Sequence, residues 1–230
     1  AASGMDAQQT RLDVTANNVA NVHTAGFKRS SAVQQDVRGG GTRIASTPRD
    51  VSQGPLETAT NAFDLAIDGP GLFRVRTPEG VRYTRAGVFG LDGSGEVVTP
   101  QGHRLEPPVR VPAGAAAFEV APDGRILAIG PDGAATEAGR ISLVRFANDQ
   151  GLAIEGRNLF GPSPSAGAPQ AGFPGAGPFG RLVTGMLEGS NTDLATETIE
   201  QIRAHRSFQI QRQTFRAADD MLGTLLDIRK

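Results

Sequence analysis

The two ends of this chain have the pattern of helices, whereas its middle has the pattern of strands. Residues 1–22 contain no Pro, and Met5, Leu12 and Val19 recur every seven residues. That spacing places the three side chains on one face of a helix. Thr24, Ala25 and Gly26 follow as a stop signal, so we expect this helix to end near Asn21.

The carboxyl-terminal end repeats the pattern over a greater length. Residues 194–228 also lack Pro, and a run of polar residues at 190–193 supplies N-cap candidates. A seven-residue step again relates the apolar side chains, which are Phe208, Phe215 and Leu222, with Leu225 beside them. At 1.5 Å per residue this helix would span on the order of 50 Å.

Between about residues 44 and 160 the hydrophobic period changes to two, which indicates strands. Asp92-Gly93, Asp123-Gly124 and Asp132-Gly133 are dipeptides typical of hairpin turns. The spacing of these signals predicts a compact antiparallel β domain. Residues 64–75 alternate around a Gly-Pro-Gly turn, and residues 80–99 are expected to form strands joined by tight turns. Further short strands are expected at 109–111, 118–120, 125–129 and 140–146.

Gly and Pro supply eleven of the twenty residues in 161–180, which predicts an irregular, extended return to the last helix. The expected fold class is α+β, with terminal helices that pair into a coiled-coil-like stem and a central antiparallel β domain. The expected boundaries are a stem segment at 1–30, a linker at 31–43, the β domain with its return segment at 44–180, and a stem helix at 181–230.

Composition excludes several classes of function. The net charge is −1 and aromatic residues make up 5%, which argues against a nucleic-acid footprint. The chain has no Cys, so thiolate metal sites and Cys nucleophiles are excluded. No motif for catalysis, phosphate binding or metal binding is complete. We therefore expect no enzyme activity, cofactor, metal or small-molecule substrate.

Two helices alone make almost no core, so the apolar stripes of such a stem need other copies of the chain. If copies meet head to tail and the rotation does not close, an open filament forms. The pattern thus predicts a homopolymer. A stalked, β-rich surface protein that forms closed oligomers is the alternative from another class.

The segment NNVANVHTAGFKR at residues 17–29 resembles the signature of the bacterial flagellar rod, hook and hook-associated proteins. Similar segments follow in order over most of the chain. The resemblance implies a torque-transmitting, hollow rod in the periplasm, with the distal segment favoured. The short stretch around Gly39–Gly41, where a longer loop would be usual, leaves the proximal segment open. Implied partners are other rod proteins, the hook, surrounding ring proteins and the flagellar type III export apparatus. The resemblance also implies export without a cleaved signal peptide.

The expected functional surface is an interface between subunits. Asn17, Asn18 and Asn21 are candidates for contacts with neighbouring copies, and termination of the helix by Asn is an equal alternative. For Gly26 and Phe27 a structural turn is favoured over a contact. The complete set of expected interface residues is Met5, Leu12, Asn17, Asn18, Val19, Asn21, Phe27, Phe208, Phe215, Leu222 and Leu225.

Overall fold

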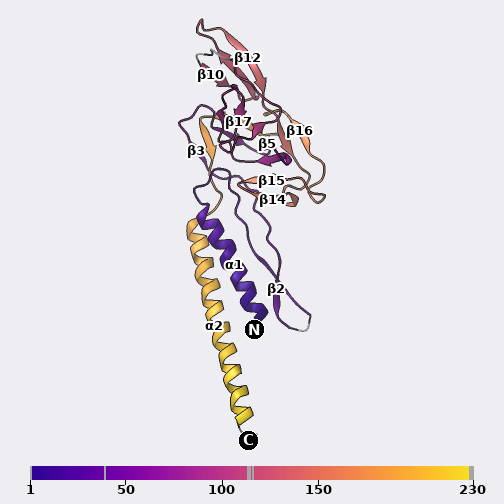
Figure 1. The fold of residues 1–230 in the computed structure, drawn as a ribbon, viewed down its shortest axis with the longest axis vertical. Coiled ribbons are helices and arrows are strands. Elements are labelled where there is room, and N and C mark those ends of the chain that lie inside the picture. Colours follow the sequence, from indigo (N-terminus) through magenta and orange to yellow (C-terminus); the bar gives the residue numbers. More distant parts are fainter. Residues whose placement is uncertain (1, 39, 113–114, 116, 228–230) are drawn as a thin grey trace. The chain divides into compact units, whose positions relative to one another are not determined.

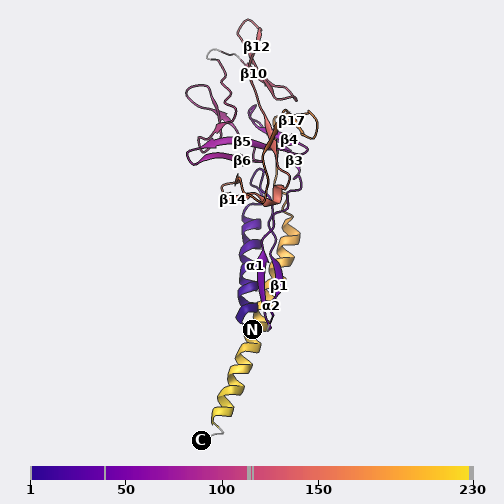
Figure 2. The ribbon, with the colours of Figure 1, turned by 90° about the vertical axis from the view of Figure 1, so that its right-hand side faces the viewer.

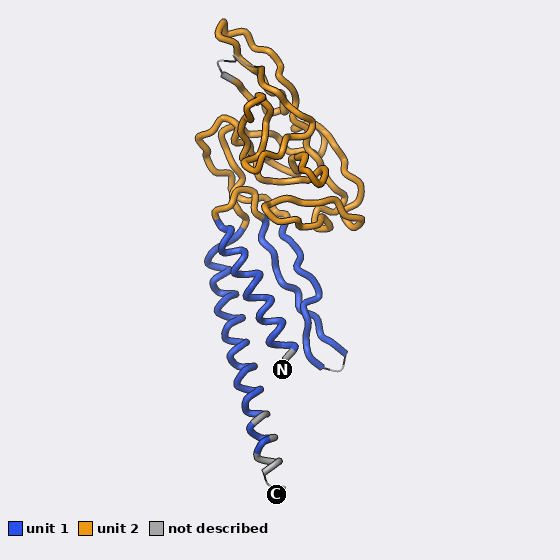
Figure 3. The backbone as a smooth tube through the Cα atoms, in the orientation of Figure 1, with its two compact units in different colours: residues 1–22, 28–50, 192–230 blue, residues 23–27, 51–191 orange. Residues whose placement is uncertain are grey.

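The computed structural model describes residues 2–38, 40–112, 115 and 117–227, and it has the α+β class that the sequence predicts. The chain forms two compact units, shown in different colours in Figure 3. Unit 1 consists of residues 1–22, 28–50 and 192–230, and unit 2 consists of residues 23–27 and 51–191. Each unit is therefore assembled from segments far apart in the sequence.

Unit 1 contains two helices and one hairpin. Helix α1 runs over Ala2–Ala20 and helix α2 over Leu194–Asp227. They lie side by side and antiparallel (Figure 1). Asp193 caps α2, because its carboxylate accepts the backbone N–H groups of Ala195 (3.2 Å) and Thr196 (3.3 Å). The coiled-coil geometry of the pair stays a prediction.

The hairpin of unit 1 is formed by β1 (Val33–Asp36) and β2 (Thr42–Ser46), which pair antiparallel. It runs beside α1 in both ribbon views (Figures 1 and 2). Residues 31–43, where the sequence suggests a linker, thus include β1 and the start of β2. An isolated two-stranded hairpin is marginally stable, so its contact with the helix matters.

Unit 2 is built from antiparallel strands. Its largest sheet has nine strands, with the path β14-β15-β6-β5-β9-β8-β7 and β13 joined to both β5 and β16. A second sheet has the order β10-β11-β12, and two strand pairs, β17-β4 and β18-β3, complete the unit. The bounds are β3 Leu56–Thr58, β4 Leu65–Asp68, β5 Leu72–Thr77, β6 Gly80–Thr84, β7 Gly90–Leu91, β8 Val97–Val98, β9 Arg104–Leu105, β10 Ala117–Val120, β11 Arg125–Ile129, β12 Ala135–Arg140, β13 Leu143–Arg145, β14 Ala153–Gly156, β15 Leu159–Gly161, β16 Gln170–Gly172, β17 Arg181–Thr184 and β18 Met186–Glu188.

The core of unit 2 follows from the alternation of its strands. Phe73 and Val75 on β5 are fully buried, whereas the residue between them is not. The ring of Phe73 meets that of Phe89 edge-on at 5.1 Å between centroids. A second cluster forms around Tyr83 and Phe146, whose rings are 4.8 Å apart. Edge-to-face geometry of this kind stabilises aromatic pairs beyond the area they bury.

Two sequence expectations differ from the structure. Residues 109–111 form no strand; they contribute one isolated bridge between Glu96 and Arg110. Pro107, Pro108 and Pro112 flank the segment and remove the N–H donors that a ladder requires. The return segment 161–180 is also more regular than expected, because it contains β16, which pairs with β13.

Candidate assembly surface and the networks that support it

Polar side chains form hydrogen bonds and an ion pair that join α1 to α2. The side-chain amide of Asn18 donates to Glu197 on α2 at 3.1 Å and to the carbonyl of Ser30 at 2.7 Å. Its oxygen accepts the backbone N–H of Ser30 at 3.0 Å. The guanidinium of Arg29 then donates to the other oxygen of Glu197 at 2.8 Å. Asn18 and Glu197 are each 1% exposed, so the centre of this network is buried, whereas the side chain of Arg29 is 30% exposed.

Two further contacts set the antiparallel register. Arg11 pairs with Glu200 at 2.7 Å. Nearer the start of α1, a Cβ on Gly4 would lie 3.0 Å from the side-chain amide of Gln211, so the two helices approach closely there. As the residue number falls along α1, the number of its partner rises along α2. The buried face of α1 is therefore small and polar and consists of Gly4, Ala7, Gln8, Thr15 and Asn18.

The expected apolar stripe of α1 flanks this face. Met5, Leu12 and Val19 are each half-buried. These three residues do share one face of α1. The residues that contact α2 most directly lie on the neighbouring face. The three side chains retain apolar surface that the chain itself does not cover.

Helix α2 exposes more apolar surface than the sequence stripe suggests. Phe208 is half-buried, and Phe215 is 50% exposed. Three isoleucines that the stripe omits are equally exposed: Ile199 at 50%, Ile202 at 49% and Ile210 at 63%. Their spacing of three and eight residues places them on one face of the helix, away from Glu197 and Ala204. The side chains of Leu222 and Leu225 lie outside the described residues.

The remaining expected interface residues make contacts within the chain. The side chain of Asn21 donates to the backbone oxygen of Asn17 at 2.8 Å and to its side chain at 3.2 Å, at the end of α1. Phe27 is 4% exposed, so it is a core residue of unit 2. Gly26 has φ of +67°, and a Cβ there would lie 2.4 Å from the backbone nitrogen of Ala86. The favoured structural turn agrees with this geometry.

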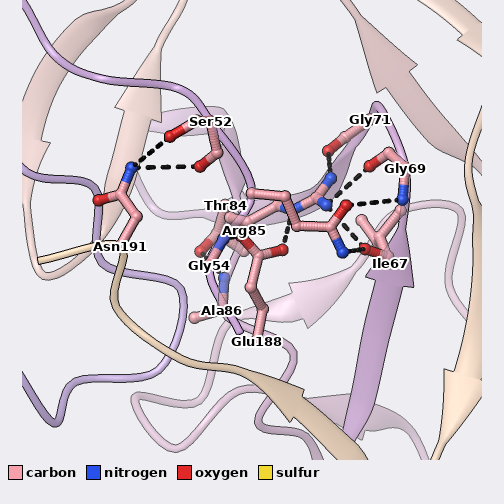
Figure 4. Close-up of polar contacts among 11 residues, drawn as sticks. Ser52, Gly54, Ile67, Gly69, Gly71, Thr84, Arg85, Ala86, Glu188 and Asn191 are labelled. Atoms are coloured by element: carbon pink, nitrogen blue, oxygen red, sulfur yellow. Dashed lines mark hydrogen bonds and ion pairs between the residues drawn. The ribbon is translucent and has the colours of Figure 1, made fainter. Parts of the chain in front are cut away.

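A buried ion pair in unit 2 was not predicted from the sequence (Figure 4). The guanidinium of Arg85 donates to the carboxylate of Glu188, to the carbonyl of Gly71, and to the carbonyls of Ile67 and Gly69, the last two at 2.7 Å. The side chains of Arg85 and Glu188 are 6% and 0% exposed. A buried Arg needs such a full set of acceptors, because an unpaired buried charge is very costly.

Glu188 connects this pair to other segments of unit 2. Its second carboxylate oxygen accepts the N–H of Gly54 at 3.0 Å, and its backbone carbonyl accepts the N–H of Gly26 at 2.7 Å. Nearby, the side chain of Asn191 donates to Ser52 (Figure 4). The turn at 23–27, the segment at 51–54 and the end of β18 are thus fixed around one glutamate, Glu188, through its backbone carbonyl and its carboxylate. Sequence patterns do not predict this ion pair, because Arg85 and Glu188 lie 103 positions apart in the chain.

The described residues hold no group of three or more His, Asp and Glu side chains placed to share a metal ion. Neither described helix combines the length and the apolar character that a membrane span requires. The arrangement offers hydrogen bonds, ion pairs and apolar surface, which are the means of assembly.

Three family models match the chain, in the order expected along it. The flagella basal body rod protein model matches residues 1–28, the flagellar hook protein FlgE/F/G D1 domain model matches residues 66–128, and the flagellar basal body rod FlgEFG protein C-terminal model matches residues 183–228. Fold and matches together define a structural protein of the flagellar axis.

Curated relatives make the assignment narrower. The chain is 37% identical to the flagellar basal-body rod protein FlgG of Bacillus subtilis, over 99% of this chain and 97% of that protein. It is 34% identical to FlgG of Borreliella burgdorferi, over 100% and 97%. Identity to the flagellar hook protein FlgE of Escherichia coli is 36%, over 82% of this chain and 48% of that protein. The chain belongs to the FlgG family of flagellar basal-body rod proteins.

Membership in this family confirms the resemblance and the structural, non-enzymatic role that it implied. It also favours the distal-rod interpretation over the proximal one and over a stalked surface protein. The alignment to the B. subtilis protein covers 255 positions, more than the 230 residues of this chain. That relative therefore has residues without a counterpart here.

Proposed function

We propose that this protein is a subunit of the distal flagellar rod, and that its copies assemble into a hollow helical shaft that carries torque from the motor to the hook. The observation that carries the proposal is the antiparallel pair of helices α1 and α2 in unit 1. A polar contact between Asn18 and Glu197 joins the two helices, and large apolar side chains of α2 remain exposed. Such a pair gains stability when further copies cover those side chains.

The area that such burial removes from water gives the size of this contribution to assembly. Full burial of an Ile side chain contributes about 1.5–3 kcal/mol relative to exposure. Ile199, Ile202 and Ile210 each expose about half of their surface. Covering the remainder contributes roughly 1 kcal/mol per residue, repeated in every subunit along the shaft.

The other proposed partners are neighbouring rod proteins, the hook, the surrounding rings and the export apparatus.

The proposed location is the part of the basal body that crosses the periplasm, reached through the flagellar export apparatus without a cleaved signal peptide. The expected coiled-coil stem and the expected domain boundaries belong to the same proposal. The expected interface residues Met5, Leu12, Val19, Phe208 and Phe215 retain exposed apolar surface, which supports their part in it.

The test is electron microscopy of basal bodies from a strain that lacks the gene. We expect basal bodies without a complete rod and without a hook, with recovery by the wild-type gene. Complete rods and hooks in the deletion strain would contradict the proposal. An Ile202→Glu gene should fail to restore rods, because it places a charge on the apolar face of α2.

Ile154→Glu is the matched control, since Ile154 on β14 of unit 2 is exposed to a similar extent, 53%. It should restore complete rods. Far-UV circular dichroism should show that both variants fold. Restoration by Ile202→Glu would mean that the apolar face of α2 is not an assembly surface.

A further inference from the structure

One side of helix α2 combines large apolar side chains with a cation. Ile199, Ile202 and Ile210 are each about half exposed or more, and Arg206 between them is also exposed. Steps of three and four residues relate these positions, so they share the side of the helix that points away from α1. We call these four residues the back face of α2.

Helix α1 carries a face of the opposite kind. Asp6, Gln9, Asp13 and Ala16 are all exposed and also follow one another at steps of three and four residues. The residues that contact α2, such as Asn18, lie on the other side of the helix. We call these four exposed residues the outer face of α1. It is acidic and has a small residue, whereas the back face of α2 is basic and has large ones.

The contacts inside the helix pair fix which residues are level along the axis. Asn18 bonds Glu197 near one end of the pair, and Gly4 lies against Gln211 near the other. These two contacts are separated by 14 residues on each helix. Each step along α1 therefore corresponds to one step in the opposite direction along α2.

At these levels the two faces match in shape and in charge. Ala16 is level with Ile199, so a small side chain comes opposite a large one. Arg206 is level with the midpoint between Asp6 and Asp13, about one helical turn from each carboxylate. A long guanidinium side chain can reach either carboxylate across that distance.

We propose that the outer face of α1 in one copy packs against the back face of α2 in a second copy, at the levels that the helix pair itself has. This inference rests on the proposed polymer and specifies one of its contacts. In a shaft whose copies all point the same way, the two helices meet antiparallel, as they do within the chain. Because the two faces differ, each copy offers one to either neighbour, and the contact can repeat without closing.

Charge complementarity is the reason to assign a second copy to these faces. Within the part of the chain that the structure describes, Asp6, Asp13 and Arg206 form no ion pair. The neighbouring cation Arg203 already pairs with Glu200 at 2.8 Å. The proposed contact places a carboxylate on each side of the guanidinium of Arg206 and covers the isoleucines at the same time.

The two faces cannot meet within one chain. Asn18 and Glu197 mark the inner sides of the two helices, and both faces lie on the outer sides. The axes of packed helices are about 8–10 Å apart, and Cα atoms on the outer sides are farther apart still. A disulfide needs Cα atoms within about 7 Å of each other. A disulfide between the two faces would therefore join two copies.

A charge exchange tests the contact. Arg206→Asp, expressed in the deletion strain, should abolish complete rods and swarming, because three carboxylates would then meet. Adding Asp6→Arg and Asp13→Arg to this variant should restore both. Arg181→Asp makes the same change at an exposed position on β17 of unit 2, and this control should leave rods intact. Unimpaired assembly of Arg206→Asp, or a triple variant that is folded by circular dichroism yet does not recover, would overturn the inference.

Cross-linking separates this inference from the proposed function. Because the chain has no Cys, Ala16→Cys combined with Ile199→Cys introduces the only thiols, at two positions that the contact makes level. Oxidation of purified basal bodies should give a ladder of dimers, trimers and longer species, and each single variant should not. Only monomers from complete rods would overturn the contact while the rod function stands. Dimers without longer species would indicate a closed contact and would also overturn it.

Discussion

The side-chain amide of Asn18 donates to the carboxylate of Glu197 across 179 positions of sequence, at 3.1 Å, in a buried position where α1 ends and α2 begins. The same Asn also bonds both backbone groups of Ser30. One amide thus holds α1, the start of the hairpin arm and α2 together. Without it, the polar atoms that it bonds would lose a partner in a buried position.

Asn18→Ala should destabilise the helix pair by about 1–3 kcal/mol, because it leaves buried partners without hydrogen bonds. The measurement is urea denaturation of the full chain followed by far-UV circular dichroism. Asn17→Ala is the matched control, since Asn17 is exposed and its side chain accepts a hydrogen bond from the neighbouring Asn21 on the same helix. Equal losses in the two variants would contradict the assigned role of Asn18.

Glu188→Gln and Arg85→Met should each destabilise unit 2 by about 3–5 kcal/mol, since each leaves a buried charge without its partner. Urea denaturation monitored by the fluorescence of Tyr83, which is buried in the same unit, reports the loss. Arg76→Met provides the comparison. Arg76 pairs with Glu106 at 2.7 Å but its side chain is 60% exposed, so little change is expected.

Gly87→Ala should lower the melting temperature strongly. A Cβ at Gly87 would lie 1.6 Å from the carbonyl oxygen of Leu65, so the backbone of β4 would have to move. A cost of about 3 kcal/mol corresponds to a fall of roughly 6–12 °C in a chain of this size. Gly90→Ala has nothing within 4 Å of the added atom and should melt close to the wild type in calorimetry. A wild-type melting point for Gly87→Ala would refute the close approach of the two backbones.

Acid should weaken the start of α2 through Asp193. Hydrogen bonds from the Thr196 hydroxyl and from the Ala195 N–H lower the pKa of Asp193 below its ordinary value. Because the folded pKa is the lower one, the stabilising effect is complete above the unfolded pKa of about 3.9 and is lost as the pH falls through the folded pKa.

Asp193→Asn retains a capping side chain but does not titrate in this range. The difference in helix stability between wild type and Asp193→Asn, from urea denaturation, should therefore be constant near neutral pH and change below about pH 4. This comparison removes the effect of the other carboxylates. A difference that stays constant into acid would show that Asp193 is not a charged cap.

The local signals of the sequence predicted the elements well. The Pro-free ends form α1 and α2, and Asp92-Gly93, Asp123-Gly124 and Asp132-Gly133 all fall in turns between strands. Such features depend on neighbouring residues, which is why a pattern reveals them. The strand expected at 109–111 failed because the flanking prolines outweigh the alternation.

Local sequence patterns could not predict the contacts between segments that are distant along the chain. A period of seven located Met5, Leu12 and Val19, yet the residues that contact α2 include Arg11 and Asn18, whose partners no single-helix pattern identifies. No sequence motif distinguishes Arg85 from the other arginines of the chain. Its role depends on Glu188 and on three carbonyls that only the folded backbone brings together.

The two units interleave along the chain, which crosses between them at residues 22–23, 27–28, 50–51 and 191–192. Neither unit is a contiguous stretch of sequence. Among the described elements, α1 precedes every strand along the chain, and its partner α2 follows all of them. Contacts of such high sequence separation slow folding. Unit 1 can therefore be completed only when residues 192–230 are present. The helix pair then forms only after the β strands have been delivered.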